Sequence, residues 1–224
     1  MTTTQPRPST SGEPAGRRSS RGARAVLVLA IALLLVLLVR SFVVQTFSIP
    51  SDSMQPTLQP GERVLVWRVD ASDVQRGDVV VFDGTGTFAD APPEPQGLAA
   101  VGAGVAGVLG FRPGESDFVK RVVGLPGDRI TCCDAQGRLL VDGTPLEEPY
   151  VQPGDAPSEL RFDIEVPEGR LWVMGDHRSD SVDSRSHLGS PGGGTIALDD
   201  VIGRVVAITW PLDAVGTVGR GSAS

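Results

Sequence analysis

A long apolar run near the N-terminus is the feature that most limits how this chain can fold. Residues 25–39 (AVLVLAIALLLVLLV) are fifteen uncharged apolar residues, and after Arg40 and one serine the run resumes at residues 42–44. Counted through Val44 the stretch has 20 residues, which as a helix spans about 30 Å, the thickness of a bilayer's hydrocarbon core. We therefore expect a transmembrane anchor over residues 25–44, with Arg40 reaching toward the headgroups.

A cleaved secretory signal is the alternative, because a basic start and a fifteen-residue apolar core also fit that description. Residues 40–50 offer no Ala-x-Ala-like cleavage site and are rich in bulky side chains, which favours a retained anchor. Residues 1–24 hold five Arg against one Glu. The positive-inside rule then places the N-terminus in the cytoplasm and the body outside.

Composition indicates what kind of body follows the anchor. The 224 residues carry a net charge of -7, and without the basic first 24 residues the rest carries -11. An acidic body would repel phosphate, so we expect no nucleic-acid partner. With 28 Gly and 18 Pro the chain is rich in turn residues, which predicts short strands joined by loops and a mostly β fold.

Short apolar runs between Gly and Pro turns predict where these strands lie. Residues 1–24 have the composition of a disordered tail, residues 83–115 that of a low-complexity surface loop, and residues 213–224 that of a flexible tail. The predicted strands are Arg63–Trp67, Asp78–Phe82, Phe118–Val123, Arg138–Val141, Arg170–Met174 and Val201–Trp210.

The cysteines and histidines indicate neither a disulfide framework nor a metal site. Cys132 and Cys133 are adjacent, and neighbours can close only a strained eight-membered ring, so we expect no disulfide within the chain. His177 and His187 lie ten residues apart, and no CxxC or Cys/His metal spacing occurs in the sequence.

A serine cluster follows the apolar run. Pro50 and Pro56 bracket Ser51, Asp52, Ser53, Met54 and Gln55, and the two prolines restrict the backbone on both sides. Such a loop can hold a nucleophilic hydroxyl rigidly, close to the membrane. The alternative is an ordinary turn that links the membrane helix to the first strand.

One lysine stands out among the basic residues. Of the 20 Lys plus Arg, only Lys120 is lysine, and only lysine can lose its proton when it is buried. Alternation along the predicted strand puts Lys120 on the face of Phe118 and Val122, and Arg121 on the opposite face. A neutral lysine amine can act as the base for a serine nucleophile. The alternative is a lysine that extends from the strand into solvent.

The third segment, residues 175–189 (GDHRSDSVDSRSHLG), follows an apolar strand. Its Asp, Ser and Arg side chains predict a loop held by hydrogen bonds and Arg–carboxylate pairs. Its expected role is support. A Ser–His–Asp triad with His177 or His187 is a further alternative, because the sequence does not place either histidine relative to Ser53.

Together the three segments resemble the type I signal peptidases, membrane-bound Ser/Lys endopeptidases that remove signal peptides from exported proteins. Residues 49–58 (IPSDSMQPTL) are similar to the family's nucleophile box, residues 120–128 (KRVVGLPGD) to its lysine box and residues 175–189 to its last box, in the same order. Residues 61–68 and 76–82 are similar to the strands after the first box.

The resemblance implies specific roles for residues of the three boxes. Ser53 is the expected nucleophile and Lys120 the general base, while Ser51 would complete an oxyanion hole with the backbone N–H of Ser53. Ser181 would hydrogen-bond and orient the lysine. The chain departs from the family at His177, where most members have Asn. An expected supporting ion pair is formed by Asp183 and Arg185.

The resemblance also implies how substrate binds. The peptide would lie extended against strand edges near residues 47–53 and 117–120, with small side chains in shallow apolar pockets. The expected substrate-binding residues are Phe47, Ile49, Met54, Leu58, Asp117, Phe118 and Val119.

The implied fold is an antiparallel β-sheet catalytic core with a small β insertion, preceded by one transmembrane α-helix. The core would comprise residues 45–128 and 171–212, and the insertion residues 129–170. We expect a monomer in the bacterial cytoplasmic membrane that spans it once, with its catalytic domain extracytoplasmic, signal-peptide-bearing preproteins and the lipid bilayer as partners, and no cofactor.

Two other functions remain open at this point. One is a related Ser/Lys protease that processes a single dedicated pilin or surface-protein precursor. The other is an inactive membrane-anchored β domain that binds exported peptides without cutting them, which would leave Ser53 and Lys120 without a task.

Overall fold

The computed structural model describes residues 22–33, 44–68, 73–90 and 116–221. The chain divides into two units, residues 1–39 and 40–224. Residues 22–33 of the first unit are helical. Among the described residues no helix has the length and apolar character to span a bilayer. Residues 34–43 of the predicted anchor and residues 1–21 of the predicted tail lie outside the described residues.

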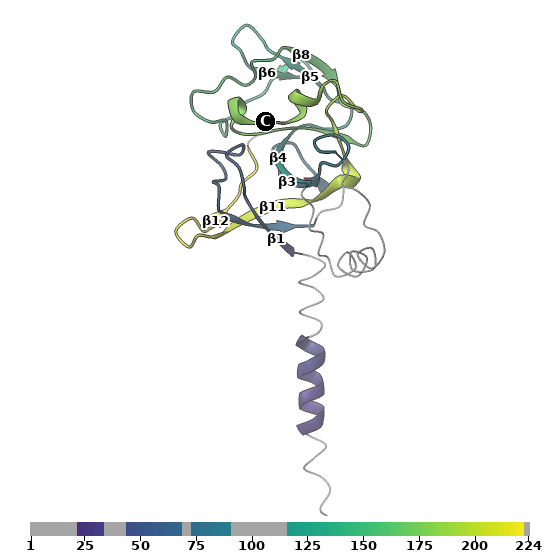
Figure 1. The fold of residues 1–224 in the computed structure, drawn as a ribbon, viewed down its shortest axis with the longest axis vertical. Coiled ribbons are helices and arrows are strands. Elements are labelled where there is room, and N and C mark those ends of the chain that lie inside the picture. The colour runs from purple at the N-terminus through teal and green to yellow at the C-terminus, as the bar shows by residue number, and fades with distance from the viewer. Residues whose placement is uncertain (1–21, 34–43, 69–72, 91–115, 222–224) are drawn as a thin grey trace, which may run out of the picture. The chain divides into compact units, whose positions relative to one another are not determined.

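The second unit is built on antiparallel sheets, which confirms the predicted mostly β fold (Figure 1). An eight-stranded sheet has the order β1-β2-β11-β3-β4-β9-β10, and β12 pairs with β11. Its strands are β1 (Val44–Ser48), β2 (Arg63–Trp67), β3 (Val79–Asp83), β4 (Asp117–Gly124), β9 (Arg170–Met174), β10 (Ile196–Ala197), β11 (Val201–Trp210) and β12 (Gly216–Thr217).

A four-stranded sheet, of order β7-β6-β5-β8, is formed entirely within the predicted insertion. In Figure 1, β5, β6 and β8 lie at one end of the unit, and β1, β11 and β12 at the other. The strands of this smaller sheet are β5 (Arg129–Cys132), β6 (Leu139–Val141), β7 (Thr144–Pro145) and β8 (Phe162–Glu165). The 3-10 helices of the unit are η2 (Arg178–Asp180), η3 (Ser184–His187) and η4 (Leu198–Asp200).

The apolar run of β3 places that strand in the middle of the sheet. Val79 and Val81 pack in one apolar cluster and Val80 and Phe82 in another, as expected where successive side chains point to opposite faces and both faces are covered. The first cluster also holds residues from the serine loop. The register pairs Val80 with Lys120, so the lysine strand lies directly beside the core of the molecule.

A third apolar cluster joins the four-stranded sheet to the larger one. Trp172 of β9 is fully buried and its ring lies 5.3 Å from that of Phe162 in β8. Leu139 and Ile130 complete the same cluster from β6 and β5. Burial of these apolar side chains fixes the insertion against the strand that precedes the third segment.

All six predicted strands are present. Those over residues 63–67, 170–174 and 201–210 have the predicted bounds, and those at 78–82, 118–123 and 138–141 differ by a residue at one or both ends. The longer missed strands are β1, β5 and β8; the last two are four-residue strands whose fully buried positions number only one or two. Val44, the last residue of the predicted span, begins β1. Of the predicted loop 83–115, residues 91–115 lie outside the described residues.

Two expectations about the chain are corrected. Cys132 and Cys133 form a disulfide, contrary to the expectation of none within the chain; the peptide bond between them is cis and their Cα atoms are 3.0 Å apart. Residues 213–221 are not a loose tail, because β12 pairs with β11 and Arg220 bonds to Asp78. Residues 222–224 lie outside the described part.

Leu139→Ala tests whether the third cluster supports the fold. Leu139 is 0% exposed, so its truncation should lower the free energy of unfolding by about 2–5 kcal/mol through lost burial and a cavity. Urea unfolding measures the change. Leu160→Ala is the matched control in the same insertion, because Leu160 is 52% exposed and its truncation should have little effect. Equal losses would contradict the assignment of the core.

Candidate active site

The serine loop and the lysine strand meet at one buried hydrogen bond. Lys120 Nζ lies 2.7 Å from Ser53 Oγ, although the two residues are far apart in sequence. Ser53 is 7% exposed and Lys120 is 4% exposed. The two residues singled out for chemistry are therefore in hydrogen-bond contact, shielded from solvent.

Burial is the strongest influence on the Lys120 amine, and it lowers the pKa from 10.5 to about 8. The charges of Asp183 and Asp176 oppose burial and raise this pKa, whereas Arg185 lowers it. At pH 7 an amine with a pKa of about 8 is neutral in about one molecule in ten, against about one in three thousand at 10.5. A usable fraction of the protein therefore carries a base beside Ser53.

The Ser53 turn is held from both sides. Ser51 Oγ lies 3.3 Å from Ser53 Oγ, on the exposed side of the turn. The backbone N–H of His177 donates to the Ser53 carbonyl at 3.1 Å. A Cβ at Gly175 would lie 2.4 Å from the same carbonyl oxygen, so only glycine lets the third segment approach the turn this closely.

Ser181 does not make the contact that the resemblance implies. Among the described residues no hydrogen bond joins it to Lys120, and its buried Oγ meets the geometry of a hydrogen bond with no group. The hydroxyl instead packs on Gly175, where an added Cβ would lie 2.3 Å from Oγ. Ser181 still lies close enough to Asp183 to help hold the pKa of that carboxylate down.

Asp183 and Arg185 form a buried ion pair. Arg185 Nε and Nη2 donate to the two carboxylate oxygens at 2.8 and 2.7 Å, and the backbone N–H of Gly175 donates to Asp183 Oδ2 at 3.0 Å. Burial alone would raise the pKa of Asp183, but the bonds and charge of Arg185 outweigh it and hold the pKa below its ordinary value. The carboxylate therefore remains ionised near Lys120.

Sequence reasoning missed a second ion pair, between Arg121 and Asp176. Arg121 is 1% exposed and donates to Asp176 at 2.8 Å through Nε and 2.6 Å through Nη2. Thr57 Oγ1 also donates to Asp176 at 2.5 Å. All three segments thus meet on one carboxylate. An arginine inside an apolar strand was the available signal, since such a charge requires a buried partner.

The insertion reaches the same network through Glu148 and Tyr150. Arg178 donates to both carboxylate oxygens of Glu148, at 2.5 and 3.2 Å. Tyr150 donates from its hydroxyl to Glu148 at 3.1 Å, and its ring centre lies 4.0 Å from the guanidinium carbon of Arg121. No pattern in the sequence predicted these contacts.

The residues expected to line substrate pockets are divided in their exposure. Ile49, Met54 and Leu58 are 3%, 1% and 0% exposed, so they form the core beneath the serine turn and offer almost no surface to a ligand. Phe47 and Val119 are half-buried against the same cluster.

The two residues before Val119 also lie in β4. Phe118 packs on Phe82 and Phe88, with ring centres 6.0 and 5.4 Å away. Asp117 is half-buried and pairs with Asp83 in the β3–β4 register. Of the expected set, Phe47 and Val119 therefore combine exposed surface with contact to the cluster under the serine turn.

The geometry suits acyl transfer by a hydroxyl and an amine. The described residues hold no hydrogen bond between Ser53 and either histidine ring, and the buried Nδ1 of His177 and Nε2 of His187 have no bonding partner there. No group of His, Cys, Asp and Glu in that part of the chain could hold a metal ion. The Ser–His–Asp alternative therefore has no geometric support.

Comparison with known proteins gives a consistent result. A family model described as signal peptidase, peptidase S26, matches residues 22–210. A probable signal peptidase I of Mycobacterium leprae (strain TN) is 36% identical over 236 residues, covering 91% of this chain and 81% of that protein. The signal peptidase I of Mycobacterium tuberculosis (strain ATCC 25618 / H37Rv) is 34% identical over 230 residues, covering 92% and 77%. That of Leptolyngbya laminosa is 30% identical over 197 residues, covering 87% and 82%.

Asp176→Asn tests the buried pair that joins the segments. It leaves the Arg121 guanidinium buried without a counter-charge, which should lower the free energy of unfolding by about 3–5 kcal/mol, as measured by urea unfolding. Asp163→Asn is the control, because the Arg129–Asp163 pair is exposed to solvent and should contribute little. Similar effects of the two substitutions would show that the Asp176 pair does not hold the segments together.

Proposed function

The chain belongs to the signal peptidase family, peptidase S26, and we propose that Ser53 and Lys120 are the dyad with which it works. Its family makes the protein a serine endopeptidase that removes signal peptides from preproteins. The observation that carries the assignment of the dyad is the buried contact of 2.7 Å between Lys120 Nζ and Ser53 Oγ.

In the first half of the reaction the neutral amine of Lys120 takes the proton of Ser53 as Oγ attacks the scissile carbonyl carbon. The carbonyl oxygen becomes an oxyanion. We assign its stabilisation to the Ser53 backbone N–H and the Ser51 hydroxyl, whose oxygen lies 3.3 Å from the nucleophile. The ammonium of Lys120 then donates its proton to the leaving amine nitrogen, the peptide bond breaks and Ser53 is left acylated.

In the second half the same amine acts on water. Lys120, neutral again, takes a proton from a water molecule that attacks the acyl carbon. Collapse of this second tetrahedral intermediate breaks the bond to Ser53 Oγ, which recovers its proton from the lysine, and the product leaves as a carboxylic acid that releases its own proton to solvent. Protons and bonds balance over the cycle with Ser53 and Lys120 alone.

Substrate is proposed to bind as an extended chain beside the dyad. Strand β4 pairs with β9 only from Arg121 onward, so the β4 residues up to Lys120 have no β9 partner on that side. Strand β1 ends at Ser48, just before the serine turn. Backbone pairing along these two segments would give affinity, and apolar side chains there would select small substrate residues. Phe47 and Val119 are the favoured selectors, because both keep exposed surface beside the core cluster.

The membrane arrangement is also part of the proposal. Relatives of this chain are bacterial signal peptidases, and the 20-residue apolar stretch preceded by five arginines supports one span with a cytoplasmic N-terminus. The catalytic unit would then act as a monomer at the outer face of the cytoplasmic membrane. A protease restricted to one dedicated precursor shares all these features and differs only in its substrates.

Ser53→Ala and Lys120→Arg test the dyad. Loss of the hydroxyl, or replacement of the amine by a guanidinium that cannot lose its proton, should lower kcat/KM for a secretory precursor by at least about a thousand-fold. Cleavage is followed by gel and the new N-terminus located by sequencing. Ser190→Ala, at a serine outside the three boxes, is the control. Cleavage by either dyad variant at the parent rate would refute the mechanism.

The acid limb of the pH profile should report Lys120. Below its pKa of about 8 the lysine is protonated and cannot act as base, so kcat/KM should rise with pH through about 8 and level off above it. The profile is measured with a peptide that does not titrate between pH 6 and 10. An acid limb with its midpoint near pH 10.5, the ordinary pKa of lysine, would contradict the prediction, because it would mean that the catalytic amine is exposed to water.

A further inference from the structure

The ring of Tyr150 lies between Arg121 and Gly221. The guanidinium carbon of Arg121 lies 4.0 Å from the ring centre. Gly221 also packs against the ring, where an added Cβ would lie 2.2 Å from Cδ1. The hydroxyl of Tyr150 donates to Glu148 at 3.1 Å, and burial, followed by the charge of Glu148, raises its pKa above the ordinary value. Tyr150 is therefore an uncharged, partly enclosed ring.

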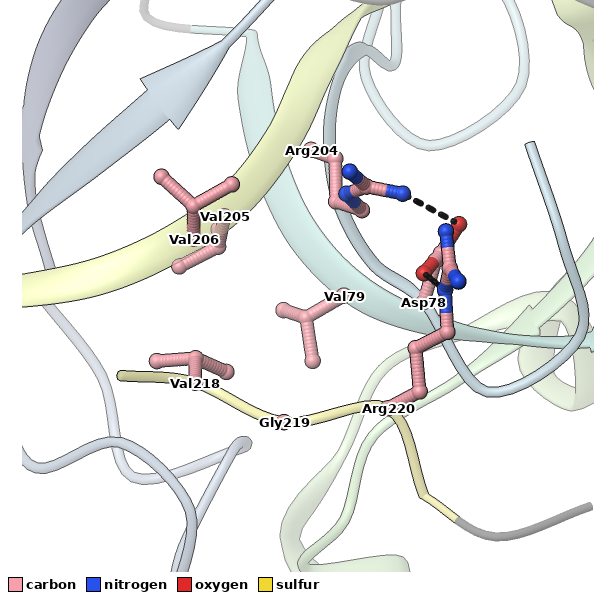
Figure 2. A pocket seen from close by; sticks show the side chains of 8 residues that line it. All are labelled: Asp78, Val79, Arg204, Val205, Val206, Val218, Gly219 and Arg220. Atoms are coloured by element: carbon pink, nitrogen blue, oxygen red, sulfur yellow. Dashed lines mark hydrogen bonds and ion pairs between the residues drawn. The ribbon is translucent and has the colours of Figure 1, made fainter. Parts of the chain in front are cut away.

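Residues 216–221, which we name the C-terminal strap, are bound along their length. β12 pairs with β11, Val218 donates through its backbone to Val206 at 3.0 Å, and Gly221 donates to the Gly77 carbonyl at 3.3 Å. Arg220 Nε bonds to Asp78 at 2.6 Å. Figure 2 shows Arg204 and Arg220 both directed at Asp78, beside a pocket of about 270 Å³ whose wall includes four valines.

The strap and the dyad share Arg121. Its Nη1 donates at 2.7 Å to the Gly77 carbonyl, the same oxygen that accepts from Gly221, while Nε and Nη2 hold Asp176. Hydrogen bonds fix the edges of the guanidinium plane, and the Tyr150 ring covers one face of it. Arg121 adjoins Lys120 in β4, so the bonds that hold Arg121 also hold the part of the strand that presents the amine to Ser53.

We propose that Tyr150 is a positioning residue of the dyad: its ring, backed by the C-terminal strap, holds Arg121 on Asp176 and thereby fixes Lys120 against Ser53. The role rests on the dyad proposed above. It predicts an electrostatic signature as well, because the charged groups acting on Lys120 are Asp183, Asp176 and Arg185. If Arg121 loosens, the Asp176 charge is less neutralised and the acid limb should move to higher pH.

Tyr150→Leu removes the aromatic face and keeps an apolar side chain. In the full-length protein kcat for a precursor peptide should fall about ten-fold, and KM should change by less than about two-fold. The midpoint of the acid limb of the pH profile should move to higher pH. Tyr150→Phe keeps the ring, so its kcat and the midpoint pH of its acid limb should both be close to those of the parent protein. Thermal unfolding shows whether each variant is folded at the assay temperature.

A pair of glycine variants tests the strap independently. Gly221→Ala places a Cβ against the ring and should reproduce both the lower kcat and the shift of the acid limb to higher pH. Gly219→Ala is the matched control, because nothing lies within 4 Å of a Cβ at that position. Adding Gly221→Ala to Tyr150→Leu should have little further effect, since both act on one contact.

Each outcome separates the two proposals. Parent kcat and an unmoved limb in folded Tyr150→Leu, or in Gly221→Ala, would overturn the positioning role and leave the dyad intact. An effect of Gly219→Ala equal to that of Gly221→Ala would also overturn it. Ser53→Ala is assayed in parallel, and its full activity would refute the dyad whatever the Tyr150 variants do.

Discussion

An amine held out of water beside a hydroxyl is the constraint on which the arrangement of this site depends. Burying a charged ammonium without compensation costs several kcal/mol, so the buried environment favours the neutral form. Two carboxylates nearby, Asp183 and Asp176, would reverse that preference if they were bare. Each is instead paired with an arginine, Arg185 or Arg121. The paired carboxylates can thus hold the loops together while their pull on the proton of Lys120 is reduced.

The same pairs explain how three distant segments form one rigid site. Thr57 from the serine loop, Arg121 from β4 and Asp176 from the loop after β9 share one set of hydrogen bonds. A backbone bond from His177 to Ser53 adds a second link between the first and third segments. Because these contacts are made within the protein, the proposed nucleophile and base are held together without substrate, which is the condition for effective catalysis by proximity.

Sequence patterns predicted the features that depend on neighbouring residues, such as strands and the burial of Lys120. They did not predict contacts between residues that are far apart in the chain. Alternation in β4 was enough to predict a buried Lys120, but the carboxylate that neutralises Arg121 lies 55 residues away. Family resemblance implied a bond from Ser181 to Lys120, yet the Ser181 hydroxyl lies against Gly175 and has no hydrogen-bond partner among the described residues. The strap has the composition of a flexible tail, but distant partners order it: β12 pairs with β11, Arg220 bonds to Asp78 and Gly221 packs on Tyr150. The short strands β5 and β8 bury too few side chains to show a period.

The place of β11 in the sheet has a consequence for how the enzyme comes into being. This late strand lies between β2 and β3, which are joined closely in sequence but not in space. Before β11 has been made, β2 and β3 therefore each lack one neighbouring strand, and nothing in the sheet joins them. The contact between Ser53 and Lys120 can therefore form only after nearly the whole chain has been made, so an unfinished polypeptide has no assembled site.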